Sequence, residues 1–183
     1  MIKKVKFNSP VILGFSLICA GVFLLNKFSG DTLMPFFAVG NRIDINNPFS
    51  VFTLVSHVFG HISWDHLLGN LSFILLIGPI VEEKYSSFQM ALMMFATALV
   101  TGILNVLFFH TGLLGASGIV FMLILLVSFT NVQSGEIPIT FILVALLFVG
   151  KELLQSVRAD QVSQFAHIIG GACGSFFGFR RHK

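Results

Sequence analysis

The sequence has few charged residues: of 183 residues, 11 are Lys or Arg and 8 are Asp or Glu, which together make 10% of the chain. Soluble domains carry about 25% charged residues, so this composition argues against a surface solvated by water. Hydrophobic residues make up 55% of the chain, with 22 Phe among them. The composition indicates a protein embedded in a lipid bilayer, and the length suits one domain over residues 1–183.

Cysteine is also scarce. Cys19 and Cys173 both lie within apolar segments, which favours small buried residues over a disulfide framework. The net charge is +3, and the basic residues stand at the borders of apolar runs. A nucleic-acid-binding face interleaves basic residues with polar and aromatic ones. We therefore expect no nucleic-acid partner.

Six apolar segments follow one another along the chain, and we predict that each crosses the membrane as a helix: residues 10–27, 65–82, 88–109, 114–130, 137–150 and 164–179. A spanning helix needs about 20 apolar residues, so the fifth segment would not qualify by itself. The stretch between Lys84 and Glu136 holds no charged residue and is long enough for two crossings. The predicted fold class is an all-α integral membrane bundle of six helices.

An even number of crossings places both termini on one side of the membrane. Basic residues gather at both ends of the chain, so the positive-inside rule predicts that both termini are cytoplasmic. The connections 28–64, 110–116 and 151–163 then lie outside. The second, fourth and sixth helices all begin at that outer face.

The first segment also has the pattern of a secretory signal peptide, a basic start followed by an apolar run. Asn26, Lys27 and Phe28 follow it in place of a small-residue cleavage site. We therefore expect a multi-pass protein of the cell membrane. In the absence of a transit peptide, we expect the plasma membrane of a prokaryote.

Polar residues stand near the start of the second, fourth and sixth segments. His66 and Asn70 open the second, Ser117 opens the fourth and His167 opens the sixth. Polar and ionisable residues at membrane depth mark function by default. A serine hydroxyl is a weak nucleophile until a base takes its proton, and an imidazole is the usual base. The pattern predicts serine hydrolysis with Ser117 as nucleophile and His167 as general base.

The spacing supplies the other parts that this chemistry needs. His66 and Asn70 are four residues apart and share one helical face, so both can donate hydrogen bonds to an oxyanion, together with the backbone N–H of Ser117. Small residues let backbones approach closely, which is the role we expect for the glycines beside Ser117 and for the G-x-x-x-G of the sixth segment. Those glycines are Gly115, Gly118, Gly170 and Gly174.

Three alternatives remain open at this stage. A serine in a membrane helix is usually bonded to its own turn. His57, His61 and His66 could ligate a metal, although no Glu stands between them as in a zinc protease and no third ligand is evident. The same histidines with His167 could relay protons in a transporter, which would also need acidic residues within the membrane.

Three motifs resemble those of the rhomboid family of intramembrane serine proteases. Residues 61–70, HISWDHLLGN, are similar to its H-x4-H-x3-N motif. Residues 115–118, GASG, are similar to its G-x-S-G motif, and residues 166–174, AHIIGGACG, to its A-H-x-x-G-x-x-x-G motif. The resemblance covers about residues 10–180, in order and on alternate predicted helices.

The resemblance implies a Ser117–His167 dyad without an aspartate, and no metal or organic cofactor. It implies that Asn70 and His66 hold the oxyanion and that His61 is a structural support. The implied substrates are single-span membrane proteins of the lipid bilayer, cut in or near their membrane spans. The oligomeric state is not predicted.

The sequence departs from the family pattern at several positions. Phe121 stands where the family often has Tyr, so a ring can pack on His167 without a hydroxyl. Ser86 stands four residues after Glu82, where a Gly is common, and a Trp-Arg pair of the first outer loop is missing. A catalytically silent rhomboid-like protein that binds membrane helices is the alternative. Such proteins commonly lose the nucleophile or the base, and both are present here.

Overall fold

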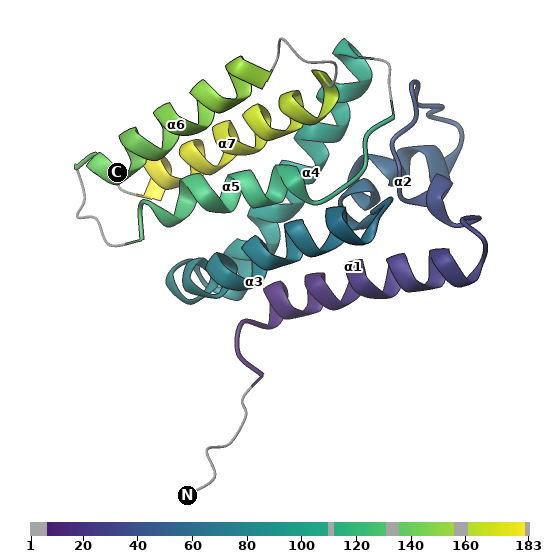
Figure 1. Cartoon of the computed structure of the whole chain (residues 1–183), viewed down its shortest axis with the longest axis horizontal. Coiled ribbons are helices and arrows are strands. Elements are labelled where there is room, and N and C mark those ends of the chain that lie inside the picture. Colours follow the sequence, from purple (N-terminus) through teal and green to yellow (C-terminus); the bar gives the residue numbers. More distant parts are fainter. Residues whose placement is uncertain (1–6, 110–111, 131–135, 156–160, 182–183) are drawn as a thin grey trace, which may run out of the picture.

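A computed structural model describes residues 7–109, 112–130, 136–155 and 161–181. Within these residues the regular structure is helical (Figure 1). The elements are α1 (Pro10–Phe28), η1 (Met34–Phe36), α2 (Pro48–Ser56), η2 (His57–Phe59), α3 (Trp64–Tyr85), α4 (Ser87–Phe108), α5 (Ser117–Val127), α6 (Ile139–Gln155) and α7 (Gln161–Arg181). The all-α prediction therefore holds for the described part of the chain.

Three of these helices are long and apolar enough to cross a membrane: α1, α3 and α4, with 19, 22 and 22 residues. At about 1.5 Å per residue they extend about 28 to 33 Å, which matches a hydrocarbon core of about 30 Å. The sequence analysis placed boundaries for these three within three residues of the observed ones. The count of six crossings stays a prediction.

The fourth predicted segment, 114–130, was too long at both ends. The helix α5 has 11 residues, or about 16 Å, which is about half the thickness of the hydrocarbon core. After Val127 the backbone tightens, since Ser128, Phe129 and Thr130 each donate to the carbonyl three residues back. Such i−3 bonds are typical of a frayed helix end.

The connection 28–64 contains helices that were not predicted from the sequence. In α2, Pro48 occupies the first helical turn, and the side chain of Asn47 accepts a hydrogen bond from the backbone N–H of Phe49 at 3.0 Å. An Asn cap followed by Pro is a strong helix start. At nine residues, α2 is too short to resemble a spanning segment.

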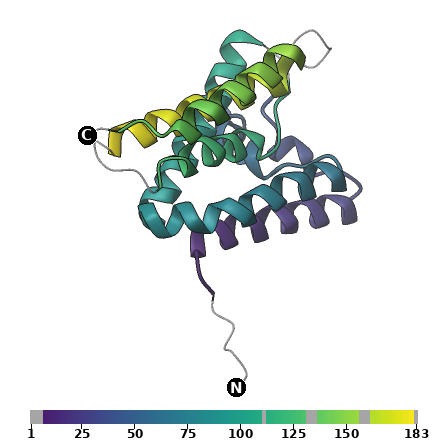
Figure 2. The ribbon, with the colours of Figure 1, turned by 60° about the vertical axis from the view of Figure 1, so that its left-hand side comes forward.

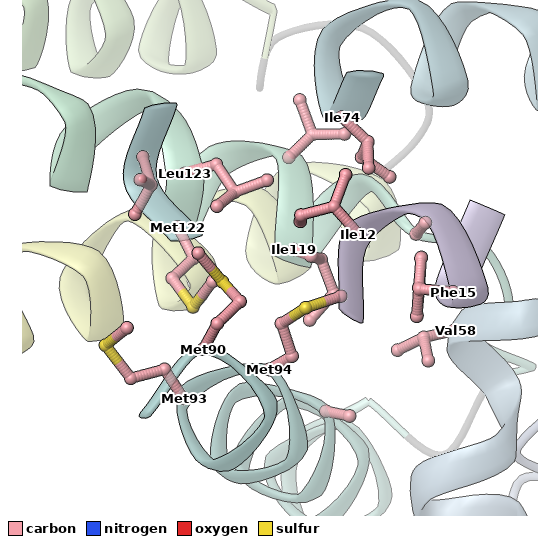
Figure 3. Packing of buried hydrophobic residues seen from close by; sticks show 14 of the residues in the cluster. Ile12, Phe15, Val58, Ile74, Met90, Met93, Met94, Ile119, Met122 and Leu123 are labelled. Carbon is pink, nitrogen blue, oxygen red and sulfur yellow. The ribbon is translucent and has the colours of Figure 1, made fainter. Parts of the chain in front are cut away.

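The short helix α5 lies at the centre of the bundle and packs against α3, α4, α6 and α7, while α1 packs along α3 (Figures 1 and 2). The interior between α4 and α5 is rich in methionine. Met90, Met93 and Met94 of α4 and Met122 of α5 belong to one buried cluster, in which Met90 lies beside Met122 (Figure 3). Flexible thioethers fill irregular gaps well, which suits a short helix surrounded by longer ones.

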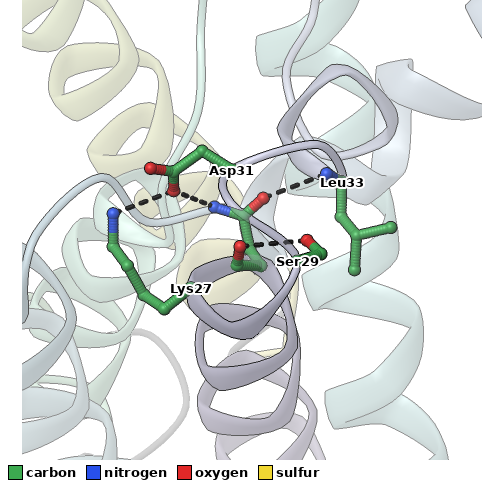
Figure 4. Close-up of polar contacts among 5 residues, drawn as sticks. Lys27, Ser29, Asp31 and Leu33 are labelled. Atoms are coloured by element: carbon green, nitrogen blue, oxygen red, sulfur yellow. Dashed lines mark hydrogen bonds and ion pairs between the residues drawn. The ribbon is translucent and has the colours of Figure 1, made fainter.

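Buried polar side chains tie both ends of α1. At its start, Glu82 accepts hydrogen bonds from the backbone N–H groups of Val11 at 3.1 Å and Ile12 at 2.9 Å. A carboxylate at a helix N-terminus is favourable because it meets unpaired donors and the positive end of the dipole. At the other end, Asn26 donates to Asp31 at 2.7 Å and accepts from the backbone of Leu33 at 3.1 Å (Figure 4).

Candidate active site

Ser117 is the first residue of α5, and it is half-buried. The preceding N-cap residue is Ala116, which has no side-chain acceptor to cap the helix. Backbone N–H groups of a first helical turn have no partner inside the helix. The N–H of Ser117 therefore stands at the positive end of the α5 dipole, where an anionic oxygen is favoured.

The loop before Ser117 is held by the connection 28–64. Val39 and Leu113 exchange two backbone hydrogen bonds, at 2.8 and 3.1 Å, and the N–H of Gly115 donates to the carbonyl of His57 at 2.9 Å. Three hydrogen bonds thus fix the backbone that leads into the serine.

Gly115 allows a histidine ring to approach this loop. Its φ of +112° lies in a region that favours glycine. A Cβ at this position would lie 2.6 Å from both Cε1 and Nε2 of His66, and 3.8 Å from Nδ2 of Asn70. The polar ends of His66 and Asn70 therefore lie against the loop that precedes Ser117.

The helices α5 and α7 touch through glycine. The position of a Cβ on Gly170 falls against the backbone of Gly118, 2.8 Å from its carbonyl carbon and 2.9 Å from its Cα. One turn further along α7, a Cβ on Gly174 would lie against the carbonyl oxygen of Met122, 3.0 Å from its carbonyl carbon and its Cα. This is the close contact of two helix backbones that the G-x-x-x-G spacing predicts.

His167 lies on the face of α7 that meets α5. Its ring stacks on Phe121, with centroids 4.2 Å apart and planes at 33°. Ser117 and Phe121 are four residues apart and so share a face of α5. His167 is also close enough to His66 for the two rings to interact electrostatically. The imidazole of His167 therefore stands beside the face that begins with Ser117.

Asn70 is supported from behind by His61. The amide nitrogen of Asn70 lies 3.0 Å from Nε2 of His61, whose Nδ1 lies 3.2 Å from the carbonyl oxygen of Phe59. Burial lowers the pKa of His61 to about 4, and nearby His66 adds to the effect. His61 is therefore neutral near pH 7, donating through Nδ1 and accepting from Asn70, whose second amide hydrogen remains for another acceptor.

His57 belongs to this site through its backbone, a role that the sequence analysis missed. Its carbonyl receives the N–H of Gly115, while its buried ring contacts the carbonyl of Thr53 at 3.2 Å and the hydroxyl of Thr101 at 3.5 Å. A carbonyl has no sequence signal of its own. Among the described residues, no group of three or more His, Cys, Asp or Glu could hold a metal ion.

The predicted site residues thus converge where α3, α5 and α7 begin. Three sets of contacts lie near Ser117 in the chain or on its helix: His66 and Asn70 with Gly115, Gly170 with Gly118, and His167 with Phe121. His61 stands behind Asn70, and Gly174 lies further along the contact between α5 and α7.

This architecture defines an all-helical membrane protein with a polar cluster at one end of its bundle. The sequence model of the Rhomboid domain matches residues 48–183, and the chain belongs to the rhomboid family. It is 29% identical over 114 residues to the rhomboid protease GlpG from each of two strains of Klebsiella pneumoniae. The match covers 62% of this chain and 41% of those relatives. The protein is therefore a multi-pass membrane protein of a protease family.

Proposed function

We propose that the protein is an intramembrane serine endopeptidase, with Ser117 as nucleophile and His167 as general base. The main support is the stacking of His167 on Phe121, one helical turn from Ser117. The contact between Gly118 and Gly170 holds α5 and α7 close enough for this stacking. A Cβ at Gly170 would collide with the backbone of Gly118, so glycine at this position allows the close approach.

The reaction follows from the placement of the groups. His167 takes the proton of the Ser117 hydroxyl as its oxygen attacks the scissile carbonyl carbon. The resulting oxyanion is held by the N–H of Ser117, the amide of Asn70 and the ring of His66. His167 then gives the proton to the leaving amine, which breaks the C–N bond. Water hydrolyses the acyl-enzyme by the same steps and frees Ser117.

The substrates we propose are single-span membrane proteins. Peptide carbonyls in an intact membrane helix are hydrogen-bonded within the helix and shielded from attack. A substrate must therefore unwind near the scissile bond, so cleavage is expected beside helix-destabilising residues. Phe121 orients the general base by packing, the role that an aspartate has in a triad.

The arrangement in the membrane is part of this proposal. Lys84, at the end of α3, and Arg180, at the end of α7, stand at the opposite end of the bundle from Ser117. With six crossings, that basic end faces the cytoplasm. The cluster around Ser117 then lies towards the outer face of a prokaryotic plasma membrane.

Labelling with a fluorophosphonate, which reacts with activated serines, tests the proposed dyad. We expect the purified protein in detergent to label, and Ser117→Ala and His167→Ala to lose the label while keeping the wild-type melting temperature. Ser72→Ala is the matched control, because the Ser72 hydroxyl bonds only to its own turn at 2.7 Å. Absence of labelling in a well-folded wild type would refute the proposal and favour a silent, helix-binding rhomboid protein.

A further inference from the structure

A groove runs between α4 and α7 on the side of the bundle away from α1. The first part of the groove is a hollow of about 400 Å³. It is lined only by apolar residues, Cys173 included: Ala96, Val100, Leu104, Ile169, Ala172, Cys173, Phe176 and Phe177. A second hollow of about 560 Å³ continues it towards the end of α7. Ala96 and Phe177 line both hollows, so the two form one continuous groove.

The two ends of this groove differ in polarity. The second hollow is lined by Tyr85, Gln89 and Arg180, together with apolar residues. Gln89 and Arg180 are exposed at the surface of the protein. None of the described residues that line the groove is acidic. One end therefore offers a cation and hydrogen-bonding groups, and the remainder offers only hydrocarbon and a thiol.

The groove is longer than half of the hydrocarbon core of a bilayer. From Gln89 to Leu104 there are 15 helical steps, which extend about 22 Å. Half of a hydrocarbon core is about 15 Å. A chain that enters at Arg180 can therefore lie along α4 as far as the middle of the membrane.

We propose that this groove binds one anionic phospholipid of the leaflet nearest to Arg180, with its phosphate at Arg180 and Gln89 and one acyl chain along Ala96 to Leu104. Arg180 supplies the charge that distinguishes an anionic headgroup from a zwitterionic one. The bound lipid fills the space between α4 and α7, the helix that carries His167. It would support the position of α7 beside its glycine contact with α5, because Cys173 and Phe177 of the groove also pack against the core.

Native mass spectrometry of the detergent-purified protein tests this directly. Phosphatidylglycerol and phosphatidylcholine with identical acyl chains are titrated separately. We expect the wild type to bind phosphatidylglycerol about fivefold or more tightly, because one juxtamembrane cation contributes about that factor. Arg180→Ala should abolish the preference, and Lys84→Ala, at the same end of the bundle but outside the groove, should retain it. Equal binding of the two lipids by wild type would overturn the proposal.

A second pair of variants tests the acyl-chain path. Ala96→Phe fills the point where the two hollows meet and should weaken binding of both lipids. Ala91→Phe places the same ring on α4 in a different apolar hollow and should leave binding unchanged. If Ala96→Phe does not fold, Ala172→Phe on the exposed face of α7 replaces it. Unchanged lipid affinity in the folded groove variant would refute the path. The readout is independent of the proposed protease activity.

Discussion

Replacing Gly170 with alanine tests whether the contact between α5 and α7 sets the distance between Ser117 and His167. The new Cβ would lie 2.8 Å from the carbonyl carbon of Gly118 and 2.9 Å from its Cα. Non-bonded carbons prefer separations of about 3.5–4.0 Å, so α7 must retreat by about 1 Å. Since His167 lies one turn from Gly170, it would retreat with the helix.

The expected effect on rate is large compared with the effect on stability. A misplacement of about 1 Å costs on the order of 100-fold in rate, whereas overpacking costs about 1–3 kcal/mol of folding free energy. We therefore expect Gly170→Ala to label with the fluorophosphonate about 100-fold more slowly than wild type. Its melting temperature should fall only moderately.

The matched control is Gly21→Ala in α1, where a new Cβ meets no atom within 4 Å. This variant should label at the wild-type rate and be slightly more stable, because alanine is favoured over glycine in a helix by about 1 kcal/mol. Wild-type labelling and melting of Gly170→Ala would show that the glycine contact does not position the base, and would refute the reasoning.

Four further predictions follow from the contacts described. Asn70→Ala should slow labelling by about 10²–10³, and an unchanged rate would remove Asn70 from the oxyanion site. Glu82→Gln should lower the free energy of unfolding by about 1–2 kcal/mol, because a neutral amide caps α1 more weakly than a carboxylate; thermal melts beside Glu83→Gln, an exposed neighbour, measure the difference. Ser86 has a φ of +75°, so Ser86→Gly should raise the melting temperature by relieving strain of about 1 kcal/mol, and a lower melting temperature would contradict this. The pKa of His61 is about 4 in the folded protein and about 6.5 in the unfolded protein. Between these two pH values, the His61 ring is therefore protonated mainly in the unfolded state. Stability should therefore fall by on the order of 3 kcal/mol as the pH drops from 6.5 to 4, and a His61→Ala variant with the same pH slope would refute this assignment.

The sequence predicted the convergence of the site because the motifs carry their geometry with them. His66 and Asn70 share a helical face by spacing alone, and the glycines of the sixth segment predict a close helix contact. The structure has both features, with His66 beside Gly115 and Gly170 against Gly118. Whether Ser117 and His167 react as a dyad stays a prediction.

Other features could not be predicted, because they depend on partners far away in the sequence. Hydropathy marks Glu82 as a charge at the end of an apolar run, yet its partners, Val11 and Ile12, lie 71 and 70 residues away. The end of α5 at Val127 is not marked by Gly or Pro either, and Phe129 continues the apolar pattern between the hydroxyl residues Ser128 and Thr130. Local composition cannot show where a central helix stops when all of its surroundings are apolar.

Ser86 shows how a departure from a family pattern can be interpreted physically. The family often has glycine at this position, and here the serine adopts a positive φ in the turn between α3 and α4. Its hydroxyl contacts the N–H of Gln89 at 3.5 Å as the N-cap of α4. The protein therefore has a weak cap at this turn where a glycine would relieve backbone strain.

The backbone bonds from Val39 and His57 to the loop before Ser117 have a consequence for how variation affects the protein. The position of the serine is set by a segment that begins 78 residues earlier in the chain, counted from Val39 to Ser117. Both side chains are buried as well, Val39 in a cluster with Leu113 and Ala166, and His57 beside Thr53 and Thr101. Insertions or deletions in the connection 28–64 would shift these backbone bonds and would therefore disturb the loop before Ser117.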